Sequence, residues 1–125
     1  MNTTTSSGYP LITIGIPTYN RCDLVCRAIR SALSQSYPNF EIVVSNNAST
    51  DNTATAIRAI CDTRIKLLEQ SCNVGMIGNF NACLEGASGE YFLMLSDDDL
   101  LEPDALLNLS TPFRDGLVGI AAKDV

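Results

Sequence analysis

Residues 90–99, EYFLMLSDDD, join a short apolar run to three consecutive aspartates. The run at 90–95 predicts a β-strand. As the most apolar of the predicted strands, it is expected to lie centrally in a sheet, buried on both faces. Asp97, Asp98 and Asp99 follow at its carboxyl end. Three adjacent carboxylates repel one another, so something in the folded protein is expected to offset their charge.

Strand-like and helix-like segments alternate along the rest of the chain. Apolar, β-branched runs predict further strands at 11–16, 41–45, 64–69 and 117–122. Apolar residues at helical spacing predict helices within 20–35, 54–62 and 73–88 and from Pro103 onward, the first of them capped by Asn20. This order indicates an α/β fold, in which a mostly parallel sheet is flanked by helices on both faces.

Length and charge limit the possible classes of protein. The chain has 125 residues, of which 46% are hydrophobic and 18% charged, so it is long enough for one globular domain. We expect residues 1–10 to be a disordered lead-in without the features of a signal peptide, and residues 11–125 to form the domain. The net charge of −6, without a basic stripe, argues against nucleic acid as a partner.

Two residue types restrict the chemistry further. The chain has no histidine, which removes the most common general base. Its five cysteines lack the spacing of metal ligands and are expected to be reduced thiols of a cytosolic protein. No apolar run is long enough to span a membrane. Any chemistry is therefore expected to depend on carboxylates, amides, hydroxyls and a metal ion.

Three polar clusters follow predicted strands: PTYN at 17–20, SNNASTD at 45–51 and SDDD at 96–99. Because ligands of parallel α/β sheets bind beyond the carboxyl ends of the strands, we expect the three clusters to form one site. Thr18 offers a hydroxyl and Tyr19 an aromatic face, while the amide of Asn47 can match the edge of a pyrimidine. Taken singly, each cluster is also compatible with an ordinary turn or helix cap.

The acidic triplet is best explained by a divalent cation. Mg²⁺ and Mn²⁺ prefer oxygen ligands, and such an ion would keep the carboxylates ionised. The segment does not match a calcium-binding loop, and the chain has no glycine-rich phosphate loop, so the cation would have to hold the phosphates of a nucleotide. The competing interpretation is that one or two of these aspartates only cap the helix near Pro103 and are solvated.

Together these segments resemble the family 2 nucleotide-sugar glycosyltransferases. The resemblance rests on IPTYNR at 16–21, SNNASTDNT at 45–53 and the segment 73–106, which includes ASGEY directly before the acidic strand. It covers roughly residues 11–110 and implies the Rossmann-like GT-A fold. It also implies an inverting, metal-dependent transfer of a sugar from a nucleoside diphosphate donor to an acceptor.

The residues that match the family's donor and metal positions are Pro17, Thr18, Tyr19, Asn47, Asp97, Asp98 and Asp99. By this resemblance Tyr19 would lie beside the base, and Asn47 falls where the family has an aspartate that reads the uracil edge. Asp97 would approach the ribose. Asp98 would ligate the Mg²⁺ or Mn²⁺ that bridges the diphosphate, with Asp99 as a further ligand.

The sequence also departs from the family pattern. The usual DDGS is NNAS at 46–49, and Phe80 stands where an arginine is frequent, so UDP-linked and dTDP-linked donors both remain open. Family members run well beyond 125 residues and carry the catalytic base in their acceptor half; neither Asp115 nor Asp124 is marked as that base. We therefore expect a truncated donor-binding half. A glycan or lipid-linked acceptor, self-association, and a location in the cytoplasm or at the inner face of the membrane are further expectations.

Three other classes share parts of this pattern. A non-catalytic nucleotide- or metal-binding module on the same fold would bind the donor without transferring its sugar. A nucleotidyltransferase would normally have a glycine-rich loop after the first strand, which is absent here. A response-regulator-like domain would need acids after the first strand, where this chain has PTYN.

Overall fold

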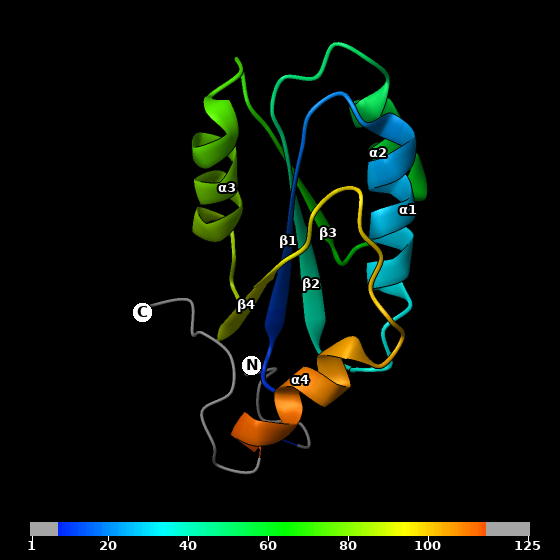
Figure 1. Cartoon of the computed structure of the whole chain (residues 1–125), viewed down its shortest axis with the longest axis vertical. Coiled ribbons are helices and arrows are strands. Elements are labelled where there is room, and N and C mark those ends of the chain that lie inside the picture. Colours follow the sequence, from blue (N-terminus) through cyan, green and yellow to red (C-terminus); the bar gives the residue numbers. More distant parts are fainter. Residues whose placement is uncertain (1–7, 115–125) are drawn as a thin grey trace.

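The computed structural model describes residues 8–114, with side chains for residues 8–111. Its elements, in chain order, are β1 (Ile12–Thr18), α1 (Cys22–Leu33), β2 (Phe40–Asn46), α2 (Thr53–Ile60), β3 (Ile65–Glu69), α3 (Gly75–Glu85), β4 (Tyr91–Met94) and α4 (Ala105–Arg114). The strands are all parallel and lie in the order β3-β2-β1-β4. Helices α1 and α2 cover one face of the sheet and α3 covers the other (Figure 1). The predicted α/β fold is confirmed.

The core is centred on β1 and β2. Ile12, Ile14 and Ile16 of β1 are fully buried, as are Ile42 and Val44 of β2. These strands read as nearly continuous apolar runs because helices cover both faces of the sheet and no strand face is left to water. Helix α1 contributes a buried apolar stripe at helical spacing, made of Val25, Ala28, Ile29 and Ala32.

The position predicted for the strand at 90–95 is wrong within the described residues. Among the four described strands, β4 lies at an edge of the sheet and pairs with β1 alone, and its four residues are only partly buried. Its apolar character has a local cause, since the ring of Phe92 lies directly over Gly15 and fills the space that a side chain there would take. The strand predicted at 117–122 lies outside the described residues.

Two predicted helix starts also need correction. Helix α1 begins at Cys22 after Arg21, without a side-chain cap. Asn20 instead has a left-handed backbone (φ 53°), and its Oδ1 accepts hydrogen bonds from the backbone N–H groups of Thr50 and Asp51. Asparagine tolerates this conformation better than most residues. Helix α4 begins at Ala105, two residues after the predicted start at Pro103.

The described part of the domain begins before residue 11. Tyr9 and Pro10, expected to belong to the lead-in, contact the domain directly. The ring of Tyr9 packs edge-on against Tyr37, with 5.3 Å between the ring centroids, and Asn39 Nδ2 donates to Tyr9 O. The Tyr37 hydroxyl donates to Pro10 O. These contacts cover the end of the sheet that lies opposite the three polar clusters.

All five cysteines lie within the described residues and are free thiols. Burial raises the pKa of Cys83 from 9.0 to about 11, so this thiol stays protonated where an exposed cysteine ionises. We expect iodoacetamide at pH 8 to label the exposed Cys61 and Cys72 quickly, and to label Cys83 only after urea unfolds the chain. Peptide mass spectrometry measures this difference.

The raised pKa also predicts a dependence of stability on pH. The folded state holds the Cys83 proton more tightly than the unfolded state does. The stability that the folded state gains from this tighter proton binding is therefore complete below pH 9 and is lost as the pH rises through about 11. Rapid labelling of Cys83 in the folded chain would contradict the burial on which both expectations rest.

Candidate functional site

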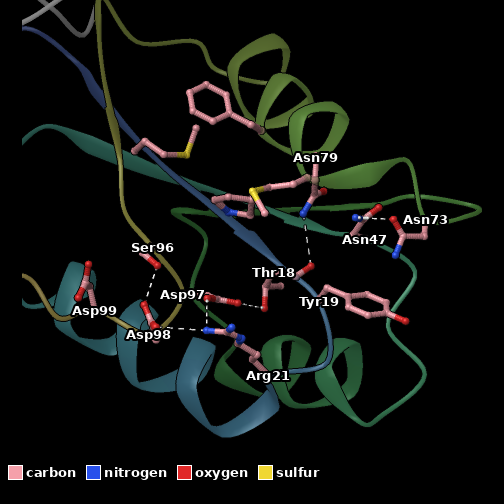
Figure 2. Close-up of a pocket in the computed structure, with 14 residues that line it drawn as sticks. Thr18, Tyr19, Arg21, Asn47, Asn73, Asn79, Ser96, Asp97, Asp98 and Asp99 are labelled. Carbon is pink, nitrogen blue, oxygen red and sulfur yellow. Dashed lines mark hydrogen bonds and ion pairs between the residues drawn. The ribbon is translucent and has the colours of Figure 1, made fainter.

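A cavity of about 710 Å³ opens at the carboxyl ends of β1, β2 and β4 (Figure 2). Its lining includes all seven predicted site residues: Pro17, Thr18, Tyr19, Asn47, Asp97, Asp98 and Asp99. The three polar clusters thus form one site, because parallel strands end at the same edge of the sheet. The cavity is also lined by residues that the sequence analysis did not select, among them Arg21, Asn73, Asn79 and Ser96.

Asp97 is the buried centre of the acidic segment, with 8% of the residue exposed. The Thr18 hydroxyl donates to its Oδ2 at 2.9 Å, which joins the end of β1 to the loop after β4. Arg21 Nη1 lies 3.4 Å from its other oxygen, Oδ1. Thr18 is itself buried, so the hydroxyl expected to face a ligand is instead used to position Asp97.

Asp98 lies next to Asp97 and is half-exposed to the cavity. Ser96 Oγ donates to Asp98 Oδ1 at 2.6 Å, and Arg21 Nη1 lies 3.2 Å from Oδ2. The Ser96 hydrogen bond, together with the nearby charge of Arg21, lowers the pKa of Asp98 below its ordinary value. One guanidinium and two hydroxyls therefore offset the charge of the first two aspartates.

The three carboxylates do not point to one place. Figure 2 shows the Asp99 carboxylate on the far side of Asp98 from Arg21. Across residues 8–111, no group of three or more histidine, cysteine, aspartate or glutamate side chains is arranged to hold a metal ion. A closed cage is therefore absent from the described part of the chain. The ionised, half-exposed Asp98 still fits a hard cation that takes one or two carboxylates and completes its shell with water and phosphate oxygens.

Asn47 is 4% exposed, and its amide is already engaged. Its Nδ2 donates to Asn73 Oδ1 at 3.0 Å and to Gly75 O at 3.4 Å, while its Oδ1 accepts from Val74 N at 2.9 Å. Asn47 therefore fixes the loop that leads into α3. One lone pair of Oδ1 remains for a ligand, whereas both donors are used.

We expect Asn47→Asp to destabilise the protein by about 1–3 kcal/mol, the usual cost of leaving buried polar groups unsatisfied. A carboxylate can still accept from Val74 N but cannot donate to Asn73 or Gly75. Urea unfolding measures the loss, and amide hydrogen exchange of residues 73–76 is expected to become faster.

The matched control is Asn81→Asp, which adds the same charge at an exposed position of α3. This control is expected to change stability by less than about 0.5 kcal/mol. Equal stability and unchanged exchange in Asn47→Asp would show that the amide contacts to the loop contribute nothing.

The cavity wall toward α3 is partly apolar. Tyr19 is 43% exposed and Phe80 44%, and Met76, in the first turn of α3, is 87% exposed. Asn79, one residue before Phe80, is buried: its Oδ1 accepts from Ser45 Oγ at 2.7 Å, and its Nδ2 donates to Thr18 O at 3.4 Å. Asn79 thereby ties α3 to the ends of β1 and β2. Flat and flexible apolar side chains beside a polar floor suit a ligand with an aromatic ring and a charged tail.

A parallel α/β sheet with such a cavity at its strand ends is the arrangement of nucleotide-binding domains. The chain belongs to glycosyl transferase family 2, whose family model matches residues 13–123. The family resemblance of the sequence is thereby confirmed.

Two relatives illustrate the range of this similarity. The chain is 37% identical over 110 residues to the GalNAc(5)-diNAcBac-PP-undecaprenol beta-1,3-glucosyltransferase of Campylobacter jejuni, a match that covers 86% of this chain and 36% of that protein. It is 36% identical over 99 residues to the hyaluronan synthase of Pasteurella multocida, which covers 78% of this chain and 10% of that protein.

Solved structures agree on the GT-A fold. The mannosyltransferase PcManGT of Pyrobaculum calidifontis, in complex with GDP-Man and Mn²⁺, matches with a TM-score of 0.72 and 30% identity over 84% of this chain and 32% of its own. The fragment 1–349 of S. aureus TarS, in complex with UDP, matches with a TM-score of 0.78 and 25% identity over 83% of this chain and 32% of that fragment. The chain spans about a third of the length of PcManGT and of this TarS fragment, and 19% of the longer TarS chain.

Proposed function

We propose that this chain is the donor-binding part of a glycosyltransferase. The full enzyme would transfer a sugar, with inversion, from a nucleoside diphosphate sugar to a glycan or lipid-linked acceptor, and would depend on a divalent cation. The observation that carries the proposal is the shared cavity, which brings Tyr19, Asn47, Asp97 and Asp98 to one edge of the sheet. Family membership and the nucleotide complexes of similar structures support it.

Each part of the cavity has a proposed role. The exposed ring of Tyr19, beside Pro17, would stack on the base, and the remaining lone pair of Asn47 Oδ1 would accept from the N3–H of uracil or thymine. Asp97, held by Thr18, would accept a hydrogen bond from the ribose. The carboxylate of Asp98, with Asp99 as a further ligand, would hold Mg²⁺ or Mn²⁺ against the diphosphate. That ion would supply Lewis-acid neutralisation of the diphosphate leaving group.

The acceptor side and the location are proposed from the relatives. The Campylobacter jejuni relative is named for an undecaprenol-linked glycan, GalNAc(5)-diNAcBac-PP-undecaprenol. A lipid-linked acceptor would place the full protein in the cytoplasm at the inner face of the membrane. Within residues 8–114, no helix combines the length and the apolar character needed to cross a bilayer. The catalytic base is proposed to lie outside the described residues.

Thermal unfolding tests the donor proposal. UDP and dTDP, each with and without Mn²⁺, are added to the native chain, to Asp98→Ala and to Glu85→Ala. Glu85→Ala is the control, since it removes a carboxylate from the far end of α3, away from the cavity. We expect UDP or dTDP with Mn²⁺ to raise the Tm of the native chain and of the control by several degrees, through mass action on the folded state.

The Asp98→Ala variant is expected to show little or no shift. The absence of a shift with either nucleotide in a native chain that unfolds cooperatively would refute the donor-binding proposal. A shift without any transfer once the rest of the enzyme is supplied would favour a non-catalytic binding module. Sedimentation of the native chain tests the expectation that it self-associates.

A further inference from the structure

Arg21 is the only basic residue among the described residues that line the cavity, where it contacts two of the three aspartates, Asp97 and Asp98. It comes from the N-cap position of α1, directly after the PTYN cluster. Its side chain is 47% exposed, so the guanidinium lies at the cavity surface and not in the core. Figure 2 shows it extended toward Asp97 and Asp98.

A single nitrogen of Arg21 serves both carboxylates. Nη1 lies 3.4 Å from Asp97 Oδ1 and 3.2 Å from Asp98 Oδ2. Both distances exceed the roughly 2.7–2.9 Å of a strong charge-assisted hydrogen bond, so neither contact is optimal. Within residues 8–111, the other guanidinium nitrogens make no hydrogen bond to protein, which leaves N–H donors for a ligand.

The two carboxylates are held unequally. The Asp97 side chain is 11% exposed and accepts a hydrogen bond from Thr18 on the neighbouring strand. The Asp98 side chain is 49% exposed, and beyond its own backbone its only other partner among the described residues is Ser96 of the same loop. The contact of Arg21 with Asp98 is therefore the one expected to be released when a divalent cation competes for Asp98, and the contact with Asp97 is the one expected to remain.

We propose that Arg21 is a positioning residue that couples cation binding to nucleotide binding. It acts as the counter-ion of Asp98 in the cation-free chain and gives up this contact when a divalent cation binds. The released guanidinium keeps Asp97 as its anchor and donates its N–H groups to the diphosphate. A cation alone must therefore displace Arg21 without compensation, whereas a cation with a nucleoside diphosphate regains the lost contact. This inference rests on the proposed donor site.

The test measures binding instead of activity. Mn²⁺ is titrated into the protein with and without UDP, and free Mn²⁺ is followed by its electron paramagnetic resonance signal. Arg21→Gln is compared with Arg27→Gln, which removes the same charge from an exposed position of α1 outside the cavity. We expect Arg21→Gln to bind Mn²⁺ alone roughly five- to tenfold more tightly than the native chain, and to bind UDP at saturating Mn²⁺ about tenfold more weakly.

The coupling between the two ligands is therefore expected to fall in Arg21→Gln and to stay native in Arg27→Gln. Arg21→Lys keeps the charge and is expected to retain part of the coupling, since an ammonium lacks the planar, forked set of N–H donors with which a guanidinium can hold Asp97 and the diphosphate together. Arg21→Met keeps the apolar stem and is the second charge-removing variant if the glutamine variant does not fold.

Two results would overturn the inference. If Arg21→Gln and Arg21→Met bind Mn²⁺ alone no more tightly than the native chain, or keep the native coupling, Arg21 does not compete with the cation, and the donor site itself stands. If the native chain shows no Mn²⁺-dependent binding of UDP, the inference fails together with the proposed function.

Discussion

Asp97→Ala is expected to weaken the binding of the nucleotide by about a hundredfold and to destabilise the folded chain by about 1–3 kcal/mol. The substitution removes the proposed acceptor for the ribose. It also leaves the buried Thr18 hydroxyl without its partner and Arg21 without the better fixed of its two carboxylates. Both effects follow from burial, because a polar group shielded from water cannot replace a lost protein partner with solvent.

Isothermal titration with UDP and Mn²⁺ measures the first effect, and urea unfolding measures the second. Thr18→Val is the informative companion, since it removes only the hydroxyl that holds Asp97 in place. It is expected to weaken binding less than Asp97→Ala does. Native affinity in Asp97→Ala would show that this carboxylate does not contact the nucleotide, whatever its contribution to stability.

Gly89→Ala is expected to destabilise the folded chain by about 3 kcal/mol. A Cβ at this position would lie 2.8 Å from both Leu11 O and Thr13 N, and 2.7 Å from Thr13 Oγ1. Two of these atoms belong to the backbone at the start of β1, which is paired with β2 on one side and β4 on the other. The strand cannot move away without breaking its hydrogen bonds.

The matched control is Gly78→Ala in α3. There a Cβ would lie 3.0 Å from Cγ2 and 3.1 Å from Cβ of the exposed Val74, which precedes the helix and has to shift only slightly, and alanine is about 1 kcal/mol better than glycine within a helix. The control is therefore expected to be neutral or stabilising. The urea midpoints of the two variants should move in opposite directions. An unchanged urea midpoint in Gly89→Ala would mean that the fold does not require the backbone at Gly89, just before β4, to lie so close to β1.

The fold is most predictable from the sequence where structure depends on local pattern. The runs at 11–16 and 41–45 were predicted correctly because strands buried on both faces are recognisable from their own residues. The order of strands in the sheet was not predictable in this way. Phe92 is apolar because it packs over Gly15, a relationship that the strand itself does not reveal.

The functional site, like the fold, is only partly predictable from local sequence. That the polar clusters share one edge follows from strand direction alone. The direction in which each side chain points depends on partners far along the chain. Asn47 bonds to Asn73, and Arg21 contacts Asp97 and Asp98 across more than half of the sequence. The position of Arg21 beside PTYN, as the nearest cation to a site rich in acids, was the signal that could have identified it.

The bond between Asn47 and Asn73 also limits how this domain can be recombined with its relatives. The two residues come from different segments, yet the donor of one and the acceptor of the other have to match. A chimera that keeps residue 47 but takes the segment from residue 73 through α3 from a relative would lose this bond wherever the relative's residue at that position offers no acceptor. Residues 47 and 73 therefore have to be exchanged as a pair.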